Sequence, residues 1–338
     1  MENFVIAKNK MPELVQTLAQ AYTVVGPVAK ESVIVFDTVD KYSDMVLEYS
    51  NTVIPPKNVV FPQTETLFTF STGETTVTAP DYTGNVVILG VRPCDAKSFA
   101  ILDHVFEGEY QDPYVKRREN TIVIGLNCIT PEDQCFCTSI GDGPFCGKYS
   151  DIQLTDLGEK YFIEVMTKKG ESLIKKIKKL VNPAADKDVK QKNELEQKAL
   201  ELITRSINIE DIVEKLEELF ESDYWRDIAK TCLGCAACTY VCPTCHCFDM
   251  QDESTFTKGA RIRVWDSCMF PEYTQQASGY NPRPERMNRV RNRVYHKFDY
   301  FPKTWDIMGC TGCGRCIAVC PVNIDIVKVV NTAQEVKK

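Results

Sequence analysis

Two runs of cysteine constrain this 338-residue chain more than any other feature. In each run two residues separate each of the first three cysteines from the next. Three residues then precede a fourth cysteine, and a proline follows it directly. This is the spacing of two-cluster bacterial ferredoxins. The runs are Cys232, Cys235, Cys238 and Cys242 before Pro243, and Cys310, Cys313, Cys316 and Cys320 before Pro321. The sequence therefore predicts two [4Fe–4S] clusters in a domain that moves electrons.

The two runs are expected to exchange one ligand each. Three cysteines two residues apart can wrap a loop around a cubane and ligate three of its irons, so the fourth thiolate must come from elsewhere. In two-cluster ferredoxins the cysteine before proline ligates the other cluster. We assign Cys232, Cys235, Cys238 and Cys320 to cluster A, and Cys310, Cys313, Cys316 and Cys242 to cluster B. Each proline is expected to turn the chain and start a helix.

Zinc, disulfides and buried thiols are the alternative explanations of these runs. Structural zinc usually takes paired cysteines from two separated segments, which fits the triplets poorly. Disulfides need an oxidising compartment, whereas the opening MENFVIAKNK lacks the apolar stretch and cleavage site of a secretory signal. Reduced core thiols would not repeat one pattern twice. The paired cluster motif is therefore the prediction.

Composition predicts a soluble, cytoplasmic protein with room for two domains. The chain is 43% hydrophobic and carries a net charge of −7. No apolar run approaches the ~18 residues that span a bilayer. Sixteen cysteines in a chain without an export signal indicate a reducing compartment, and an anaerobic host would suit exposed clusters.

Residues 1–170 predict an α/β domain with a partly parallel sheet. Residues 33–39, 85–91 and 121–126 are rich in β-branched residues and bounded by glycine or polar residues, which predicts buried strands. Between the last two strands, apolar residues recur at helical spacing over 95–106. This order predicts a β-α-β unit whose two strands are parallel.

The rest of the chain predicts helices and a cluster domain. Residues 171–230 are charged and favour amphipathic surface helices that link the two domains. Residues 231–338 predict a helical two-[4Fe–4S] ferredoxin-like domain, in which 244–309 form a long insertion between the motifs. The chain contains neither a GxGxxG fingerprint nor a P-loop after a strand, so we expect no flavin or NAD on this chain.

Four further cysteines follow the predicted parallel strands. Cys94 comes after 85–91 and Cys128 after 121–126, so both lie at the carboxyl edge where open α/β sheets bind ligands. Cys135 and Cys137 follow one short loop later. A third [4Fe–4S] cluster would use all four thiols, and the helix start after Cys94 would stabilise its negative charge. Reduced structural thiols and a zinc ion are the alternatives.

The remaining cysteines are Cys146, Cys245, Cys247 and Cys268. Cys245 and Cys247 directly follow a predicted ligand of cluster B, and Cys268 follows a predicted strand. We favour packing as small hydrophobic side chains. Replacement of an N-terminal ligand, a place in the lining of a cluster pocket and a separate redox site are the other possibilities. His246, between Cys245 and Cys247, indicates nothing alone.

The segment 281–303 is strongly basic. It carries Arg283, Arg286, Arg289, Arg291, Arg293, Lys297 and Lys303 against two acidic residues. The acidic chain and the lack of a binding motif argue against nucleic acid. We expect these cations to neutralise anionic clusters and raise their potentials, or to bind an acidic partner.

Several segments together resemble a known family. They are GVRPCD (90–95), CFCTS (135–139), CPTCHCFD (242–249), WDSC (265–268), RVRNRVYHK (289–297) and the two cluster motifs. Nearly the whole chain resembles the iron–sulfur β subunit of cytoplasmic sulfhydrogenases. Similar subunits are the A subunit of anaerobic sulfite reductase and those attached to electron-bifurcating hydrogenase or heterodisulfide reductase systems.

The resemblance implies an electron-transfer subunit of a soluble multisubunit oxidoreductase, rather than the site of substrate chemistry. Its partners would be a flavin-containing NAD(P)H-binding subunit and a catalytic subunit of hydrogenase, sulfite reductase or heterodisulfide reductase type, with ferredoxin as a further candidate. Neither nucleic acid nor a membrane is expected as a partner. One alternative is a subunit with its own catalytic iron–sulfur or thiol site that reduces a small sulfur compound. Another is a redox sensor.

Overall fold

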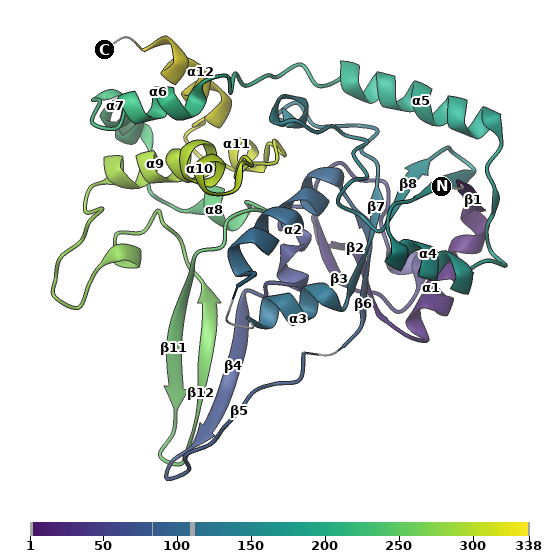
Figure 1. The fold of residues 1–338 in the computed structure, drawn as a ribbon, viewed down its shortest axis with the longest axis horizontal. Coiled ribbons are helices and arrows are strands. Elements are labelled where there is room, and N and C mark those ends of the chain that lie inside the picture. Colours follow the sequence, from purple (N-terminus) through teal and green to yellow (C-terminus); the bar gives the residue numbers. More distant parts are fainter. Residues whose placement is uncertain (1–2, 83, 109–111, 337–338) are drawn as a thin grey trace. The chain divides into compact units, whose positions relative to one another are not determined.

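The computed structural model describes residues 3–82, 84–108 and 112–336 (Figure 1). The chain forms two compact units, described here one at a time. The first unit comprises Met1–Pro56, Thr83–Arg205 and Thr311–Gly314, and the second comprises Lys57–Tyr82, Ser206–Cys310 and Arg315–Lys338. Each unit is therefore assembled from separate stretches of the chain.

An eight-stranded mixed sheet forms the centre of the first unit, in the order β10-β1-β9-β8-β7-β6-β2-β3. β6 (Val86–Val91) and β7 (Thr121–Leu126) are parallel, and β2 (Thr23–Lys30) and β8 (Ile152–Asp156) extend the parallel region on either side. The antiparallel strands are β1 (Phe4–Ala7), β3 (Val33–Thr38), β9 (Lys160–Val165) and β10 (Asn182–Pro183). The predicted parallel strands at 85–91 and 121–126 are confirmed.

One predicted strand occupies a different environment from the one expected. β3 matches the run at 33–39 but lies at the edge of the sheet, where it pairs with β2. Its residues are half-buried or exposed rather than buried, and Val33 is 40% exposed. The expectation of a buried strand was wrong because β-branched residues favour a pleated strand without determining its place in the sheet.

Helices pack around this sheet. They are α1 (Met11–Ala19), α2 (Pro93–Phe106), α3 (Pro113–Glu119), α4 (Lys168–Lys176) and α5 (Asp186–Glu201). Leu14 of α1, Leu89 of β6 and Leu173 of α4 share one buried core. α2 starts two residues after β6, with Pro93 at its first position, where no backbone N–H is needed. This short connection puts Cys94 in the first turn of α2.

The second unit combines helices with an antiparallel sheet. Its helices are α6 (Ile212–Glu218), α7 (Tyr224–Thr231), α8 (Ala237–Tyr240), α9 (Arg286–Tyr295), α10 (Phe301–Trp305), α11 (Arg315–Ala318) and α12 (Ile326–Glu335). Its strands are β4 (Thr64–Ser71), β5 (Val77–Thr78), β11 (Phe248–Ser254) and β12 (Lys258–Trp265), in the order β11-β12-β4-β5. The expectation of a helical cluster domain was therefore incomplete.

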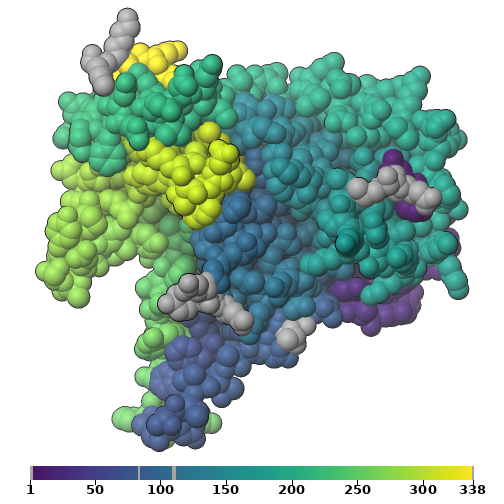
Figure 2. Space-filling model, viewed as in Figure 1, coloured from purple at the N-terminus to yellow at the C-terminus, as the bar shows by residue number. Residues whose placement is uncertain are grey.

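The four strands of the second unit come from distant parts of the sequence. Figure 2 shows the blue residues of β4 and β5 against the green residues of β11 and β12. Arg263 of β12 lies opposite Glu65 of β4, and its Nε donates to Glu65 Oε1 at 2.7 Å. Both side chains are buried, so each charge has its opposite charge as a partner in this register of the two strands.

No helix within 3–82, 84–108 and 112–336 combines the length and the apolar character needed to cross a bilayer.

Candidate metal centres

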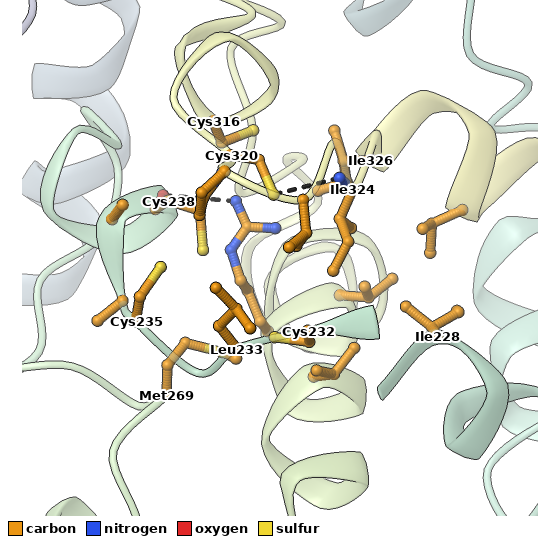
Figure 3. Close-up of a pocket in the computed structure, with 18 residues that line it drawn as sticks. Ile228, Cys232, Leu233, Cys235, Cys238, Met269, Cys316, Cys320, Ile324 and Ile326 are labelled. Carbon is orange, nitrogen blue, oxygen red and sulfur yellow. Dashed lines mark hydrogen bonds between the residues drawn. The ribbon is translucent and has the colours of Figure 1, made fainter. Parts of the chain in front are cut away.

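A pocket of the second unit is lined by all four cysteines assigned to cluster A, namely Cys232, Cys235, Cys238 and Cys320. Figure 3 shows these side chains around one space, together with Cys316. Apolar side chains such as Leu233, Met269, Ile324 and Ile326 complete the wall. An apolar wall keeps water away and is one of the features that tune a cluster potential.

The loop from Cys232 to Cys238, called loop A, turns its backbone toward the thiols. The N–H of Gly234 donates to Cys232 Sγ at 3.4 Å. From the other motif, the N–H of Ile324 donates to Cys320 Sγ at 3.1 Å, a contact drawn in Figure 3. Backbone N–H groups that reach the sulfurs favour the thiolate form. These contacts suit thiolate ligands of an anionic cluster.

The thiols assigned to cluster B are split between the two units. Cys242, Cys310 and Cys316 belong to the second unit. Burial raises the pKa of Cys316 to about 11, and the thiolates of Cys310 and Cys242 act in the same direction. Cys313 belongs to the segment Thr311–Gly314, which packs within the first unit. The structure therefore brings three of the four thiols together within one unit.

A buried lysine supports an anionic cluster beside Cys242. Lys297 is 3% exposed, and its Nζ donates to Cys242 Sγ at 3.2 Å, Thr244 Oγ1 at 2.9 Å and the Gly309 carbonyl at 3.1 Å. None of these three partners is a carboxylate. A buried ammonium requires a negative partner. The Cys242 sulfur is the contact that can supply this charge, so the site fits a thiolate ligand.

The pKa values of this pair shift in the directions that such a contact requires. Burial lowers the pKa of Lys297, but the thiolates of Cys242, Cys245 and Cys310 outweigh burial and raise it. The hydrogen bond from Cys245 lowers the pKa of Cys242 well below its usual range, and the charge of Lys297 contributes. Cys242 is therefore poised to be a thiolate.

The loop from Cys310 to Cys316, called loop B, repeats the backbone of loop A. Gly234 has φ 72° and Gly312, at the equivalent position, has φ 68°. Ala236 has φ 63° and its equivalent Gly314 has φ 73°. The left-handed region is uncommon for residues other than glycine. Two loops with the same spacing thus adopt the same unusual conformation at both positions.

The prolines after each motif do not start helices as expected. After Pro321 the chain continues to Asp325, whose side chain accepts from the N–H of Val327 at 2.9 Å and caps α12. After Pro243 the chain enters β11. The polar cap, rather than the fixed φ of proline, positions the helix start.

The first unit contains all four N-terminal cysteines. Burial raises the pKa values of Cys128, Cys135 and Cys137, that of Cys137 to about 12, and the charge of Cys128 acts on both of the others. Cys94 lies between Arg92 and Asp95, whose charges act on Cys128. Nη1 of Arg92 donates to the Asn127 carbonyl at 2.7 Å, which ties this turn to the end of β7.

Cys313 is an unexpected neighbour of these thiols. Its carbonyl accepts from Cys135 Sγ at 3.7 Å and from Asn51 Nδ2 at 2.9 Å. The N–H of Phe136 donates to the Gly312 carbonyl at 2.8 Å. The charge of Cys313 acts on Cys135 and Cys137. No local pattern in the sequence could predict this contact, because it joins residues far apart in the chain.

The other cysteines have three different environments. Cys146 donates to Asp142 Oδ1 at 3.3 Å in the first unit. In the second unit Cys245 interacts with Cys242, and Cys247 with Cys268; each interaction lowers the pKa of one thiol of the pair and raises that of the other. Burial lowers the pKa of His246 to about 4, so this imidazole is neutral at pH 7.

Only part of the basic segment 281–303 faces cysteines. Lys297 contacts Cys242, Arg293 Nη2 donates to the Cys238 carbonyl at 3.5 Å, and the charge of Arg286 acts on Cys232. By contrast, Arg289 donates to the carbonyls of Met269, Arg283 and Pro284, Arg291 to that of Phe220, and Lys303 pairs with Asp299 and Glu217. These contacts give the three cations structural roles, and the charge of Cys232 also acts on Arg289.

Comparisons with known proteins agree with the cysteine pattern. Residues 231–324 match a family model described as a 4Fe–4S dicluster domain, so the chain carries two [4Fe–4S] clusters. The chain is 34% identical over 326 residues to sulfhydrogenase 2 subunit beta of Pyrococcus furiosus, and the match covers 96% of each chain. No solved structure matches the chain. The family inferred from the sequence is thus confirmed, and the chain belongs to the sulfhydrogenase β-subunit family of iron–sulfur proteins.

Proposed function

We propose that this chain is an electron-transfer subunit of a multisubunit oxidoreductase. One observation carries the proposal. Cys316, a ligand of cluster B by its spacing, also lines the pocket formed by the four cysteines of cluster A. Cys316 of cluster B therefore lies beside the cluster A thiols within the second unit, as an electron path requires. When bound, the clusters supply one-electron chemistry, near −400 mV for typical low-potential ferredoxins.

Arg293 and Lys297 are proposed to adjust this electron path. Both belong to the basic segment 281–303. Arg293 lines the pocket of cluster A, and Lys297 contacts Cys242. A reduced cluster carries one more negative charge than an oxidised one. Fixed cations nearby favour the reduced state and raise the potential.

The N-terminal thiols are proposed to hold a third [4Fe–4S] cluster. The charges of Cys128 and Cys137 oppose ionisation of Cys135, and the charge of Cys128 opposes ionisation of Cys137, so their thiolates require a compensating cation such as iron. Cys94 occupies the first turn of α2, where the helix dipole favours negative charge. The backbone of Cys313 contacts Cys135. Because Cys313 is a ligand of cluster B by its spacing, this contact supports electron exchange between the two sites.

The proposed partners follow from the family. The relative is named as a subunit of a sulfhydrogenase, and this chain has no nucleotide-binding fingerprint. We therefore propose a separate flavin-containing NAD(P)H-binding subunit as the electron donor. The electron acceptor would be a catalytic subunit of hydrogenase, sulfite reductase or heterodisulfide reductase type.

Iron and acid-labile sulfide per chain, with electron paramagnetic resonance of the reduced protein, test the cluster content. We expect about twelve irons in the wild type and about eight in Cys135→Ser and in Cys235→Ser, each variant losing a different signal. Cys146→Ser is the matched control and should keep all of the iron. About eight irons in both the wild type and Cys135→Ser would refute the third cluster and leave a two-cluster relay.

The relay itself is tested in the purified complex. Cys235→Ser should stop electron flow from the donor subunit to the terminal acceptor, while each partner keeps its activity with an artificial dye. Unchanged transfer in a variant shown to lack cluster A would refute the proposed path.

A further inference from the structure

Two cysteines outside the cluster motifs meet at the open end of the β11–β12 hairpin. Cys247 comes directly before β11, and Cys268 lies three residues after the end of β12. Phe248 pairs with Trp265, and the N–H of Asp266 donates to the Cys247 carbonyl at 3.0 Å. The register of the hairpin therefore places Cys247 opposite Asp266, two residues before Cys268.

The two thiols are close enough to affect each other's ionisation. The side chain and the backbone N–H of Cys268 both favour the thiolate of Cys247. The hydroxyl of Tyr273 is a further donor to Cys247. Three donors around one sulfur favour its thiolate, which is the reactive form of cysteine.

The surrounding side chains hold this pair in place. Ser267, which precedes Cys268, is fully buried, and its Oγ lies 2.8 Å from Thr239 Oγ1. Lys57 is 2% exposed, lies with Nζ 4.1 Å from the centre of the Trp265 ring, and donates to the Cys245 carbonyl at 2.5 Å. The hydrogen-bonded Ser267 next to Cys268 and the buried Lys57 thus surround the pair.

The charges make one member of the pair a thiolate and leave the other protonated. The hydrogen bond from Cys268 lowers the pKa of Cys247 to about 6, and the backbone N–H of Cys268, Tyr273 and Lys57 act in the same direction. The same hydrogen bond raises the pKa of Cys268. One thiolate next to one thiol is the starting state for disulfide formation.

The pair also adjoins cluster A. Met269, the residue after Cys268, lines the pocket of cluster A. Thr239, which is bonded to Ser267, follows the cluster A ligand Cys238. The charge of Cys238 acts on Cys268. The pair and the cluster pocket are therefore separated by one short stretch of packed chain.

We propose that Cys247 and Cys268 form a dithiol–disulfide couple that exchanges electrons with the clusters of this chain. Oxidation joins the two sulfurs, releases the proton of Cys268 and releases two electrons, one to each of clusters A and B. Reduction returns both electrons and the proton and breaks the sulfur–sulfur bond. The proposal rests on the proposed electron relay in one respect, which is that the clusters accept and return the two electrons of the couple.

The couple would store two electrons at a site where the clusters pass electrons singly. Both thiols are half-buried, so the couple is shielded from bulk solvent without being sealed.

Peptide mapping of the intact holoprotein tests the couple. The protein is poised without oxygen at a series of potentials, denatured with excess maleimide and digested without reductant. Cleavage after Lys258 and Arg263 puts Cys247 and Cys268 on different peptides. We expect a linked peptide, lighter by two hydrogens than the sum of its parts. Its yield should follow a two-electron slope, about 30 mV per tenfold change, in contrast to about 59 mV for a cluster.

Three variants identify the linkage. Cys247→Ser and Cys268→Ser should abolish the linked peptide and keep the iron content of the wild type. Cys146→Ser, which removes a half-buried thiol elsewhere, should keep the link. Loss of iron in either of the first two variants would overturn the proposal and make these residues cluster ligands. The proposal would also be overturned if the wild type showed no Cys247–Cys268 link at any potential that leaves the iron bound. This result does not depend on whether a variant folds.

Cluster signals recorded in the same titration separate this proposal from the relay. Clusters that never reduce would refute the relay. Clusters that reduce normally without any linked peptide would refute the couple alone.

Discussion

Loops A and B have the same cysteine spacing and the same backbone conformation, yet their surroundings differ. A Cβ placed on Gly234 of loop A would lie 3.9 Å from its nearest neighbours, Arg286 Nε and the Met269 carbonyl. A Cβ on Gly312 of loop B would lie 2.5 Å from Cys137 Cα, and one on Gly314 would lie 2.6 Å from the Gln134 carbonyl. Glycine in loop A thus serves conformation alone, whereas in loop B it also makes room for another segment.

This difference explains why loop B cannot carry the same residue as loop A at the second left-handed position. Loop A tolerates Ala236 at φ 63°, so the left-handed conformation does not by itself require glycine at this position. Gly314 occupies the equivalent position at φ 73°. The backbone of Gln134 lies so close to it that it leaves no room for a methyl group. The close approach of the QCFC segment therefore determines the glycine in loop B.

The largest effect is expected from giving loop B the alanine of loop A. Gly314→Ala should destabilise the first unit by about 3 kcal/mol, because a backbone clash adds to the left-handed cost. Chemical denaturation monitored by circular dichroism measures the loss. Stability within about 0.5 kcal/mol of wild type would show that residues 134 and 314 are not in close contact.

Removal of the cation beside cluster B should have the next largest effect. Lys297→Met takes away the ammonium that lies 3.2 Å from Cys242 Sγ. We expect the potential of cluster B to fall by about 60 mV, the one-electron equivalent of about 1.4 kcal/mol. A redox titration followed by electron paramagnetic resonance measures this shift.

Two matched variants show whether the shift is local to cluster B. Lys303→Met removes a cation of the same segment that pairs with Asp299 and Glu217, and it should leave both potentials unchanged. Arg293→Met should lower the potential of cluster A, whose pocket Arg293 lines. Equal shifts from Lys297→Met and Lys303→Met would show that only net charge matters.

Gly234→Ala should be much milder than the equivalent change in loop B. The added methyl meets only ordinary contacts, so the left-handed conformation alone costs about 1 kcal/mol. Gly312→Ala is the paired variant, and it should lose about as much stability as Gly314→Ala because of the 2.5 Å approach to Cys137 Cα. Equal losses in the two variants would remove the distinction between the loops.

The smallest effect is expected for Ala236→Gly. Relief of the left-handed conformation is worth about 1–2 kcal/mol. Loss of a methyl group that is 2% exposed and the added freedom of glycine in the unfolded chain together cost a similar amount. The free energy of unfolding should therefore change by less than about 0.5 kcal/mol. A large loss would mean that the methyl group packs against cluster A more tightly than loop geometry requires.

Much of the cluster site could be predicted from spacing along the chain. A seven-residue loop limits where three thiols can go, so the pattern around Cys232 and Cys235 was enough to predict a shared site with Cys320. The strands at 85–91 and 121–126 were also predictable, because continuous β-branched runs have few alternatives. The exposed position of β3 and the sheet of the second unit were not predictable, since neighbouring strands are chosen by pairing rather than by composition.

Local spacing in the sequence determined the iron–sulfur character of this protein, because thiols two residues apart act together whatever the rest of the fold does. The tertiary structure alone decided that Cys313 meets Cys135 and that Cys247 meets Cys268. These contacts join residues that are distant along the chain, and they depend on strand register and on which segments pack together. Neither property is contained in the spacing of the cysteines.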